Sequence, residues 1–427
     1  MSRGEPRRVL VHAAGALGER LAGPEIRALE FAKALSAEYE VTLAAQRPSE
    51  GERDGIRVVP SSRRRLLREL AHQDALLSAC LPPYLMALAQ PSNVVMISDQ
   101  YDPHEQELAT LAAGRERERE LRSRFAIQAL QLRYADVVLC ASERQRAQLI
   151  ETAETLRPVG AAIADPAVVP FGIPDPPPPS GRRPLHEHFP QLAAGDTVVL
   201  WWGSMWRWLD AETPIRAFAA MADSRSDIKL VITAGKPPSK DAEQRFDATE
   251  QMRALASELG VLGRTVLFLD TWIPYEQRHD YLGEADIGLT LHRHAAEARL
   301  AARARYMDYL SAELPCVLGR GDETAEDFRA AGFATLLEEP DADTLAATLQ
   351  ALADDPQALA AARAAGHALA AERHWSAVGE TLRGVLAEPL RGGTRPASGH
   401  SSLGLLGGAG TYYARQAGDR LAAVATR

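Results

Sequence analysis

The sequence predicts an α/β protein made of two doubly wound, Rossmann-like domains. Short apolar runs alternate with amphipathic helical stretches, and a run of prolines divides this alternation into two halves of similar length. The apolar runs are almost uninterrupted, as expected for strands of a parallel sheet that is covered on both faces. The expected strands of the first half are Val9–His12, Val41–Ala44, Ile56–Val59, Val94–Ser98 and Val137–Cys140.

Helices are expected between these strands, for example over Pro24–Ser36 and over the charged stretch Arg115–Tyr134. The second half repeats the alternation and ends in an alanine-rich helical stretch from about Asp341 to Leu386. Its expected strands are Val198–Trp201, Lys229–Thr233, Val266–Leu269, Ile287–Leu291, Cys316–Leu318 and Thr335–Leu337.

Four consecutive prolines follow Asp175 and precede Ser180, and this run is expected to be the linker between the halves. Proline lacks a backbone N–H and holds the chain extended. We therefore expect an N-terminal domain over 1–175 and a second domain over 181–390. A flexible segment rich in Gly and Ser, with one last helix, is expected over 391–427.

The 427 residues are 46% hydrophobic and 25% charged, which is the composition of a globular protein. The net charge of −9 argues against a dedicated nucleic-acid binder, and three distant cysteines form no disulfide framework. No apolar run is long enough to span a membrane or to serve as a signal peptide, so a cytoplasmic protein is expected. Arg63–Arg65 leaves a peripheral membrane contact open, with a solvated loop as the favoured interpretation.

A glycine-rich turn follows the first expected strand and leads into a helix. It contains Gly15, Gly18 and the run Gly23–Arg27. Glycines let backbone N–H groups approach a ligand closely, and a helix N-terminus favours an anion. The spacing is not the dinucleotide-binding G-x-G-x-x-G, and a plain tight turn is the alternative interpretation.

Four of the six tryptophans lie within eight residues, Trp201–Trp208, at the carboxyl end of an expected strand. Open α/β sheets bind ligands at this edge, so the residues among the tryptophans, including Gly203, Ser204 and Arg207, are candidates for a ligand site. Packing between domains is the alternative explanation for the aromatic side chains.

A charged segment follows the strand Ile287–Leu291 and is expected to become a helix. It begins at His292 and contains Glu297 and Asp308, and if both acids are helical their separation of eleven positions places them on one face. A solvated, ion-paired helix face is the alternative. Three arginines that could serve a diphosphate lie nearby, at Arg299, Arg303 and Arg305.

Polar residues also follow the strand Val94–Ser98, and there they are placed to face a cleft between the domains. They are Asp99, Tyr101, Asp102 and His104. The sequence contains no G-x-S-x-G, no P-loop and no H-E-x-x-H motif. His292 and His294 alone are too few for a zinc site, so no metal is expected.

At these residues the chain resembles the GT-B glycosyltransferases, and among them the large retaining group called family 4. The resemblance covers most of residues 8–390 and implies two Rossmann-like domains that face a central cleft. The N-terminal domain would bind the acceptor and the C-terminal domain the nucleotide-sugar donor. Its motifs are Gly23–Arg27, Ser98–Pro103, the Trp-Trp-Gly run, Thr271–Tyr275 and the stretch from Glu297 to Pro315.

The resemblance also implies roles for individual residues. The acidic residue of the last helix, here Asp308, would bind the donor ribose, and the earlier acid, Glu297, would lie near the donor sugar. The turn Ile273–Pro274 would meet the base through its backbone.

Two departures mark the chain as a divergent branch. Ten residues separate the two acids where seven are usual, and the usual spacing would place the first acid at Leu300. The Arg and Lys that clamp the diphosphate in that group would fall near Ser204 and Leu209. Arg207, Lys236 or Arg303 are the candidate substitutes.

The leading hypothesis is therefore sugar transfer from a UDP-, GDP- or dTDP-sugar to a hydroxyl of a carbohydrate or glycoconjugate, with retention of configuration. A sugar-nucleotide epimerase and a non-catalytic GT-B scaffold are the alternatives, and the missing clamp keeps the scaffold open. No cofactor besides the donor, no metal and no nucleic acid is expected. Catalysis is assigned to Asp99, Asp102 and Glu297, and donor binding to Gly23, Gly203, Ser204, Arg207, Lys236, Ile273, Pro274, His292, Arg299, Arg303 and Asp308.

Overall fold

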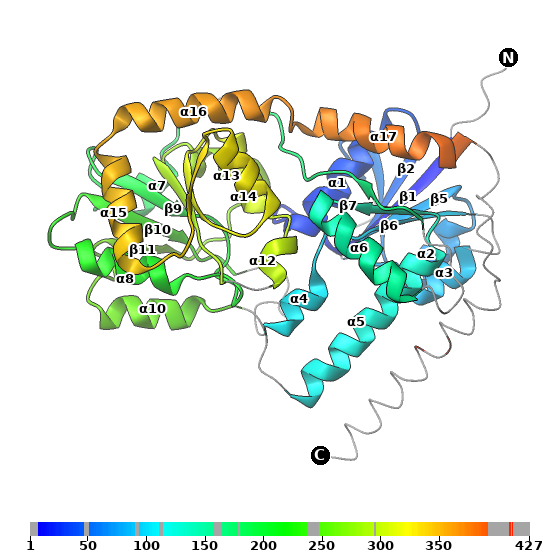
Figure 1. The fold of residues 1–427 in the computed structure, drawn as a ribbon. Helices are drawn as coiled ribbons and strands as arrows, with labels where there is room; N and C mark the ends of the chain where they lie inside the picture. Colours follow the sequence, from blue (N-terminus) through cyan, green and yellow to red (C-terminus); the bar gives the residue numbers. More distant parts are fainter. Residues whose placement is uncertain are drawn as a thin grey trace. The chain divides into compact units, whose positions relative to one another are not determined.

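The chain forms two sheets that belong to two separate units, described here from a computed structural model (Figure 1). The first unit consists of Met1–Gly18, Gly23–Pro170 and Ser376–Arg427, and the second of Glu19–Ala22 and Phe171–Trp375. The structure describes residues 7–46, 51–89, 94–110, 114–156, 164–177, 180–236, 247–293, 296–391, 410 and 412.

The first unit contains an eight-stranded sheet with the order β3-β4-β2-β1-β5-β6-β7-β8. All neighbouring strands are parallel except β3, which runs antiparallel to β4. The strands are β1 (Arg8–Ala16), β2 (Glu40–Gln46), β3 (Gly51–Arg53), β4 (Ile56–Pro60), β5 (Ala75–Ser78), β6 (Val95–Asp99), β7 (Val137–Cys140) and β8 (Ala167–Val168).

Helices connect these strands and cover the sheet, as expected for a doubly wound unit. The five strands expected from the sequence are all present, and three further strands were not expected: β3, β8 and β5, which lies between β1 and β6. The helices are α1 (Gly23–Ser36), α2 (Arg63–Leu70), α3 (Pro83–Ala89), α4 (His104–Ala109), α5 (Arg115–Tyr134), α6 (Glu143–Leu156) and α17 (Trp375–Arg391).

Helix α2 replaces the solvated loop that the sequence favoured around Arg63–Arg65. Ser62 caps it by accepting a hydrogen bond from the backbone N–H of Arg65. Leu66 and Leu70 are 1% and 3% exposed and pack in the core. The leucines of this segment therefore stabilise the unit rather than a contact with lipid.

The second unit contains a six-stranded sheet with the order β11-β10-β9-β12-β13-β14, and all its strands are parallel. The strands agree with the expected ones to within one residue at each end. They are β9 (Thr197–Trp201), β10 (Ile228–Thr233), β11 (Val266–Leu269), β12 (Ile287–Thr290), β13 (Cys316–Gly319) and β14 (Ala334–Leu337).

The helices of the second unit follow the strands in turn, and Asp322, Asp341 and Asp355 cap three of them by accepting backbone N–H bonds. The expected helical stretch from Asp341 to Leu386 is divided into α15, α16 and α17. The helices are α7 (Pro184–His188), α8 (Glu212–Met221), α10 (Thr249–Glu258), α11 (Arg278–Leu282), α12 (Ala296–Leu300), α13 (Ala304–Ser311), α14 (Glu323–Ala330), α15 (Ala342–Ala353) and α16 (Pro356–Ala370), with a 3₁₀ turn η2 (Tyr275–Gln277).

The last helix changes the expected domain boundary, because almost all of α17 belongs to the first unit. Arg383 donates a hydrogen bond to the carbonyl of Ala34 in α1 at 2.9 Å. A Cβ at Gly379 would lie 2.8 Å from the Cβ of Ala34, so the two helices approach closely. Residues 376–390 were expected in the second domain. The apolar stripe that holds them in the first unit is Val378, Leu382, Leu386 and Leu390.

The chain passes from the first unit to the second at Pro170–Phe171, five residues before the proline run. The backbone of Ile173 pairs with the segment before α17 through its bridge to His374. Asp175 forms an ion pair with the same histidine at 3.0 Å. The segment just before the proline run is therefore part of the second unit. The expected linker lies after the point where the chain passes from the first unit to the second.

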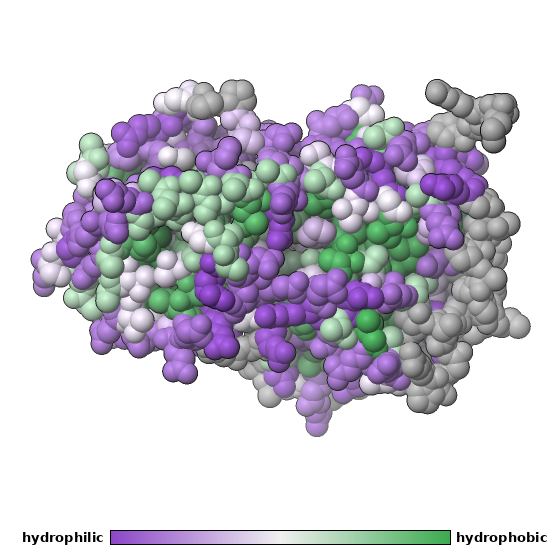
Figure 2. Space-filling model, turned by 45° about the horizontal axis from the view of Figure 1, so that its top comes forward, coloured by the Kyte–Doolittle hydropathy of each residue, from purple (hydrophilic) through white to green (hydrophobic). Residues whose placement is uncertain are grey.

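Hydrophilic side chains cover most of the face drawn in Figure 2, and the apolar areas between them are smaller. The large apolar side chains that are exposed among the described residues, Leu88, Phe125 and Leu262, lie on three different segments. None of the helices in the described ranges is both long and apolar enough to cross a membrane.

Candidate functional site

The strand order of the second sheet defines a point where ligands are expected to bind. The chain proceeds from β9 outward to β11 and then returns to the other side of β9 at β12. Open parallel sheets bind ligands beyond the carboxyl ends of the two strands at this switch. Gly203 and Ser204 follow β9 and His292 follows β12, so three predicted site residues are brought to this edge.

Asp308 lies on α13 and is joined to the segment after β9. Its Oδ2 accepts a hydrogen bond from Trp202 Nε1 at 2.9 Å, and its Oδ1 pairs with Arg278 Nη1 at the same distance. The residue is 9% exposed, and burial raises the pKa of its carboxyl. Each carboxylate oxygen accepts more than one hydrogen bond, so the group can still bind hydroxyls.

Arg278 connects Asp308 to the predicted base-binding turn Ile273–Pro274. Its guanidinium lies 3.7 Å from the ring centre of Tyr275, the residue directly after the turn. Pro274 precedes the 3₁₀ turn η2, and neither Ile273 nor Pro274 is buried. The turn and the carboxylate are therefore linked through one cation–π contact and one ion pair.

Lys236 lies at the same edge, immediately after a glycine that permits close backbone packing. A Cβ at Gly235 would lie 2.2 Å from the backbone nitrogen of Trp272, so no other residue fits there without displacing the turn. The end of β10 thus contacts the segment after β11. Lys236 itself is exposed.

Glu297 and Asp308 do not share one helix, which corrects the expectation of a single continuous helix. Glu297 lies on α12 and Asp308 on α13, and residues 301–303 between them are not helical. Glu297 is 1% exposed, and its Oε2 pairs with Arg303 Nη2 at 3.0 Å. Because the Glu297 carboxylate is almost fully buried, contact with a donor sugar requires that the residues covering it move.

A second buried carboxylate accompanies this pair. Asp322 Oδ2 lies 3.9 Å from Arg303 Nε and 3.7 Å from His292 Nε2. Burial raises the pKa of Asp322 to about 6. His292, which the sequence predicted to bind the donor, is 2% exposed. It therefore lies within a buried cluster of polar side chains.

The candidates for the diphosphate clamp differ in their surroundings. Arg207 and Arg299 are exposed, whereas Arg303 is held by Glu297. Arg305 was noted in the sequence but not assigned to the site. Its Nη2 donates a hydrogen bond to the carbonyl of Ser204 at 2.9 Å, a contact across 101 residues that only the structure reveals.

Asp99, a predicted catalytic residue of the first unit, is engaged by Arg27. The guanidinium donates from Nε to Oδ2 at 2.7 Å and from Nη2 to Oδ1 at 3.0 Å. The same arginine donates to the carbonyls of Val169 and Pro170. Asp99 and Arg27 are 3% and 1% exposed, so this pair joins β6, α1 and the segment after β8.

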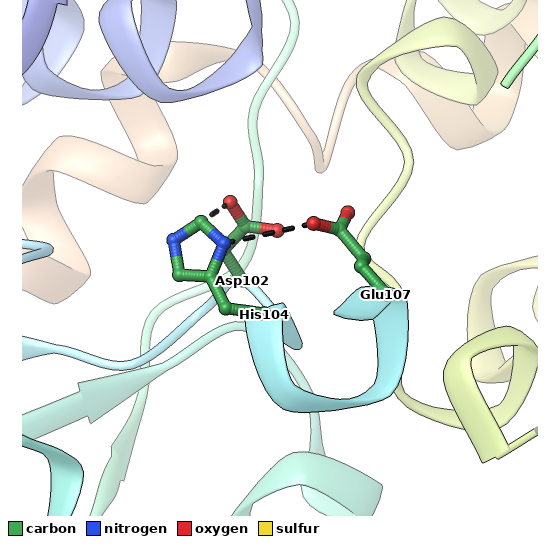
Figure 3. A group of neighbouring side chains, drawn as sticks. All are labelled: Asp102, His104 and Glu107. Atoms are coloured by element: carbon green, nitrogen blue, oxygen red, sulfur yellow. Dashed lines mark ion pairs between the residues drawn. The ribbon is translucent and has the colours of Figure 1, made fainter. Parts of the chain in front are cut away.

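Asp102 and His104 lie with Glu107 just beyond β6, and the three side chains point toward one another (Figure 3). His104 approaches Asp102 at 3.4 Å and Glu107 at 3.6 Å. The Asp102 carboxylate raises the pKa of His104 to about 10, and burial raises the pKa of Asp102 to about 6.

These three residues are the group that could hold a metal ion among the ranges that the structure describes, with ligand atoms within 4.8 Å of one another. A protonated imidazole has no free lone pair and already neutralises one of the two carboxylates. Without a metal the three side chains therefore form an ion-paired cluster, and a metal ion there would have to displace the proton of His104.

A pocket adjoins this cluster. Gln131, at the end of α5, is 3% exposed, and its Nε2 has no hydrogen-bond acceptor. Its Oε1 accepts a hydrogen bond from Gln100, which also donates to Ser98. The pocket is lined by carboxylates, amides and a cation, and such a polar lining is suited to binding hydroxyl groups. The residues that line it include Cys80, Asp99, Gln100, Asp102, His104, Arg124, Gln128 and Gln131.

His12, which was not singled out from the sequence, lies at the corresponding edge of the first sheet. Its Nδ1 and Ser78 Oγ are 2.9 Å apart, and the two residues form the last pair between β1 and β5, the two strands at the switch point. Burial lowers the pKa of His12 to about 4. The only sequence signal was a histidine at the carboxyl end of a strand.

The glycine-rich turn after β1 is occupied by a side chain of its own helix. A Cβ at Gly15 would lie 1.9 Å from Glu25 Oε1, so this carboxylate lies against the turn. Gly23 is the first residue of α1 and has helical backbone angles, so no positive φ requires glycine there. The anion beside this turn is Glu25, and the role of Gly23 in donor binding stays a prediction.

The two sheets and their helices define the class of protein: the chain has the GT-B fold of glycosyltransferases. HepE of Anabaena in complex with UDP-glucose is similar over 89% of this chain and 99% of its own, with a TM-score of 0.68 and 14% identity. WaaG, a glycosyltransferase involved in lipopolysaccharide biosynthesis, is similar over 90% and 99%, with a TM-score of 0.65 and 15% identity. Sucrose-phosphate synthase of Thermosynechococcus elongatus is similar over 90% and 98%, with a TM-score of 0.63 and 16% identity.

No protein-family model matches the sequence, and no curated protein matches it. The likeness is therefore one of fold, which confirms the fold expected from the resemblance.

Proposed function

We propose that the protein is a glycosyltransferase that transfers a sugar from a nucleotide-sugar donor to an acceptor hydroxyl. The second unit would bind the donor, and the first unit would supply the acceptor site. The observation that carries this proposal is the group at the switch point of the second sheet, where Asp308 is linked to Trp202 and, through Arg278, to the turn Ile273–Pro274.

Each part of this group suits one part of a nucleotide. A buried carboxylate that keeps free lone pairs accepts hydrogen bonds from the two ribose hydroxyls. Backbone groups of a turn that is only half-buried can recognise a base edge. A GT-B fold that places both at the carboxyl edge of a parallel sheet supports the same interpretation.

A uridine nucleotide is the first donor to test, because HepE is described in complex with UDP, with UDP and glucose, and with UDP-glucose. GDP- and dTDP-sugars are the other candidate donors. Retention of configuration is proposed from the family 4 resemblance alone.

The test is to incubate the protein with UDP-, GDP- and dTDP-sugars, with and without a panel of saccharide acceptors. Release of the nucleoside diphosphate that depends on an acceptor supports transfer. An altered sugar on an intact nucleotide would support an epimerase instead. Absence of binding to every nucleotide would support a non-catalytic protein. This alternative is favoured by the lack of cationic residues at Ser204 and Leu209.

The same assay tests two further proposals. Proton NMR of the first product formed reports whether the anomeric configuration is retained. Turnover that persists in excess EDTA would support catalysis without a metal, and restoration by one divalent cation would contradict it. Asp102, His104 and Glu107 would then be the residues to replace.

The acceptor is proposed to be a carbohydrate or glycoconjugate bound by the first unit, where the pocket beside Gln131 has a lining of amides and carboxylates. Membrane attachment and a cytoplasmic location stay predictions. Sedimentation with anionic vesicles tests attachment, with Arg63 and Arg64 as the exposed charges to replace.

A further inference from the structure

Arg305 is half-buried and differs from the fully buried arginines in having no carboxylate partner among the described residues. Arg27, Arg278 and Arg303 are less than a tenth exposed, and each forms an ion pair at 3.0 Å or less, with Asp99, Asp308 and Glu297 respectively. Arg305 forms no ion pair within the described part of the chain. Its Nη1 is buried and has no hydrogen-bond acceptor.

The environment of Arg305 makes this charge costly. Burial lowers the pKa of its guanidinium to about 10, which still leaves the group protonated near neutral pH. The one hydrogen bond of its side chain goes from Nη2 to the carbonyl of Ser204. A charged guanidinium whose Nη1 is buried without an acceptor is unfavourable, so an anion that binds there would be stabilised.

A second unmatched polar group lies in the same segment. Ser204 is 4% exposed, and its Oγ has no hydrogen-bond partner among the residues that the structure describes. Gly203, just before it, has a φ of +83°, and a Cβ there would lie 3.5 Å from Arg305 Nη2. The Ser204 hydroxyl and the Arg305 Nη1, which both lack a hydrogen-bond partner among the described residues, therefore lie at a glycine turn at the carboxyl end of β9.

These groups lie beside the residues that carry the proposed function. Ser204 is two residues from Trp202, and Arg305 is three residues from Asp308 on the same helix. A ligand held by Asp308 would thus have its neighbouring groups near Arg305. In a nucleotide-sugar, the group next to the ribose is the diphosphate.

We propose that Arg305 and the hydroxyl of Ser204 bind the diphosphate of the donor, supplying from α13 the positive charge that the segment after β9 lacks. The identity of the anion as a donor diphosphate rests on the proposed function. The existence of an anion site rests only on the unmatched guanidinium and hydroxyl.

The other candidate clamps are less suited to this role. Arg303 is committed to Glu297, and Arg207 and Arg299 are exposed to water, where ion pairs are weak. Arg305 is half-buried and its Nη1 is shielded from water, so its attraction for a phosphate is stronger than that of an exposed arginine. The same group would neutralise charge on the departing nucleoside diphosphate.

The test measures the affinities of UDP, uridine and inorganic diphosphate by calorimetry for the full chain and for Arg305→Met, Arg305→Lys and Ser204→Ala. Arg216→Met is the control, because Arg216 is an exposed arginine of the same unit whose ion pair among the described residues is with Glu212. Melting temperatures are measured for every variant, which separates loss of binding from loss of folding.

Arg305→Met is expected to weaken UDP and inorganic diphosphate about 10- to 100-fold, the range for a charge-assisted hydrogen bond, and to leave uridine unchanged. Arg305→Lys should recover part of the affinity, and Ser204→Ala should weaken it several-fold. Because Nη1 of Arg305 is buried without an acceptor in the described part of the chain, Arg305→Met should melt at the wild-type temperature or above it. A structural role for Arg305 would instead lower the melting temperature.

The outcomes separate this proposal from the proposed function. Unchanged affinity for UDP in folded Arg305→Met would overturn the role of Arg305 while leaving a nucleotide-binding protein. A wild-type protein that binds inorganic diphosphate through Arg305 but no nucleotide would overturn the proposed function and leave the anion site. Binding of neither ligand by the wild type would overturn both.

Discussion

Trp202 Nε1 donates a hydrogen bond to Asp308 Oδ2 at 2.9 Å, across 106 residues of sequence. This contact joins two features that the sequence indicated separately, a run of tryptophans and an acidic residue near a helix. It also fixes the orientation of the carboxylate, whose other oxygen pairs with Arg278. An ordered acceptor is what recognition of two neighbouring hydroxyls requires.

Asp308→Ala should weaken binding of a nucleotide-sugar by about 1.5–3 kcal/mol, because charge-assisted hydrogen bonds to the ribose are lost. It also leaves the buried Arg278 without its partner, so the free energy of unfolding should fall. Calorimetry with UDP and urea unfolding measure the two effects. Asp223→Ala is the matched control, since Asp223 is 94% exposed. Equal affinity of Asp308→Ala and the control would exclude the ribose assignment.

Asp99→Ala should lower the free energy of unfolding by about 3–5 kcal/mol, because it leaves Arg27 charged and buried. The double variant Arg27→Met with Asp99→Leu should regain part of this loss, since it removes both charges. Urea unfolding of the single and double variants gives the comparison. A single variant as stable as the wild type would mean that the pair does not hold this unit together.

Gly235→Ala should weaken UDP more than inorganic diphosphate, because a Cβ there pushes against Trp272 and displaces the turn Ile273–Pro274. Forced repacking of this kind typically costs about 1–3 kcal/mol, so the melting temperature should also fall. Gly195→Ala is the control, since nothing lies within 4 Å of its added Cβ. Equal losses for the two ligands would separate the turn from base recognition.

Acidification should destabilise the first unit through His12. Burial lowers its pKa to about 4 from the usual 6.5, so the unfolded chain takes up the proton first. The stability associated with neutral His12 is complete above pH 6.5 and is lost as the pH falls toward 4. The loss amounts to about 3 kcal/mol at the acid end of this window.

The measurement is urea unfolding of the wild type and of His12→Gln at pH 7 and at pH 4. The variant should lose less stability than the wild type between the two values, because glutamine takes up no proton. Identical losses would show that His12 is as easily protonated in the folded protein as in the unfolded chain.

The sequence was sufficient to predict most of the fold, because buried parallel strands are short, continuous apolar runs. The strand β5 was not predicted because Ala75–Ser78 belongs to a longer apolar stretch without a clear boundary. The position of α17 in the first unit was not predicted for another reason. A helical pattern reveals an apolar stripe but not the surface that the stripe covers.

The candidate site was predicted less completely, because it depends on pairing between distant side chains. The sequence predicted a helix through residues 301–303, but these residues are not helical. Arg303 forms an ion pair with Glu297 instead. Helical propensity is weak enough for such tertiary contacts to override it. The unmatched charge of Arg305 is equally invisible in the sequence, since every arginine has the same formula whether or not an acid lies beside it.

The return of α17 to the first unit has a consequence for synthesis of the chain. Domains generally fold as they leave the ribosome, the N-terminal one first. Here α1, including Ala34, packs against α17, which is synthesised only after the whole second unit. The first unit to be translated is therefore the last to be completed, and a nascent chain that stops before residue 376 leaves the surface under α17 uncovered.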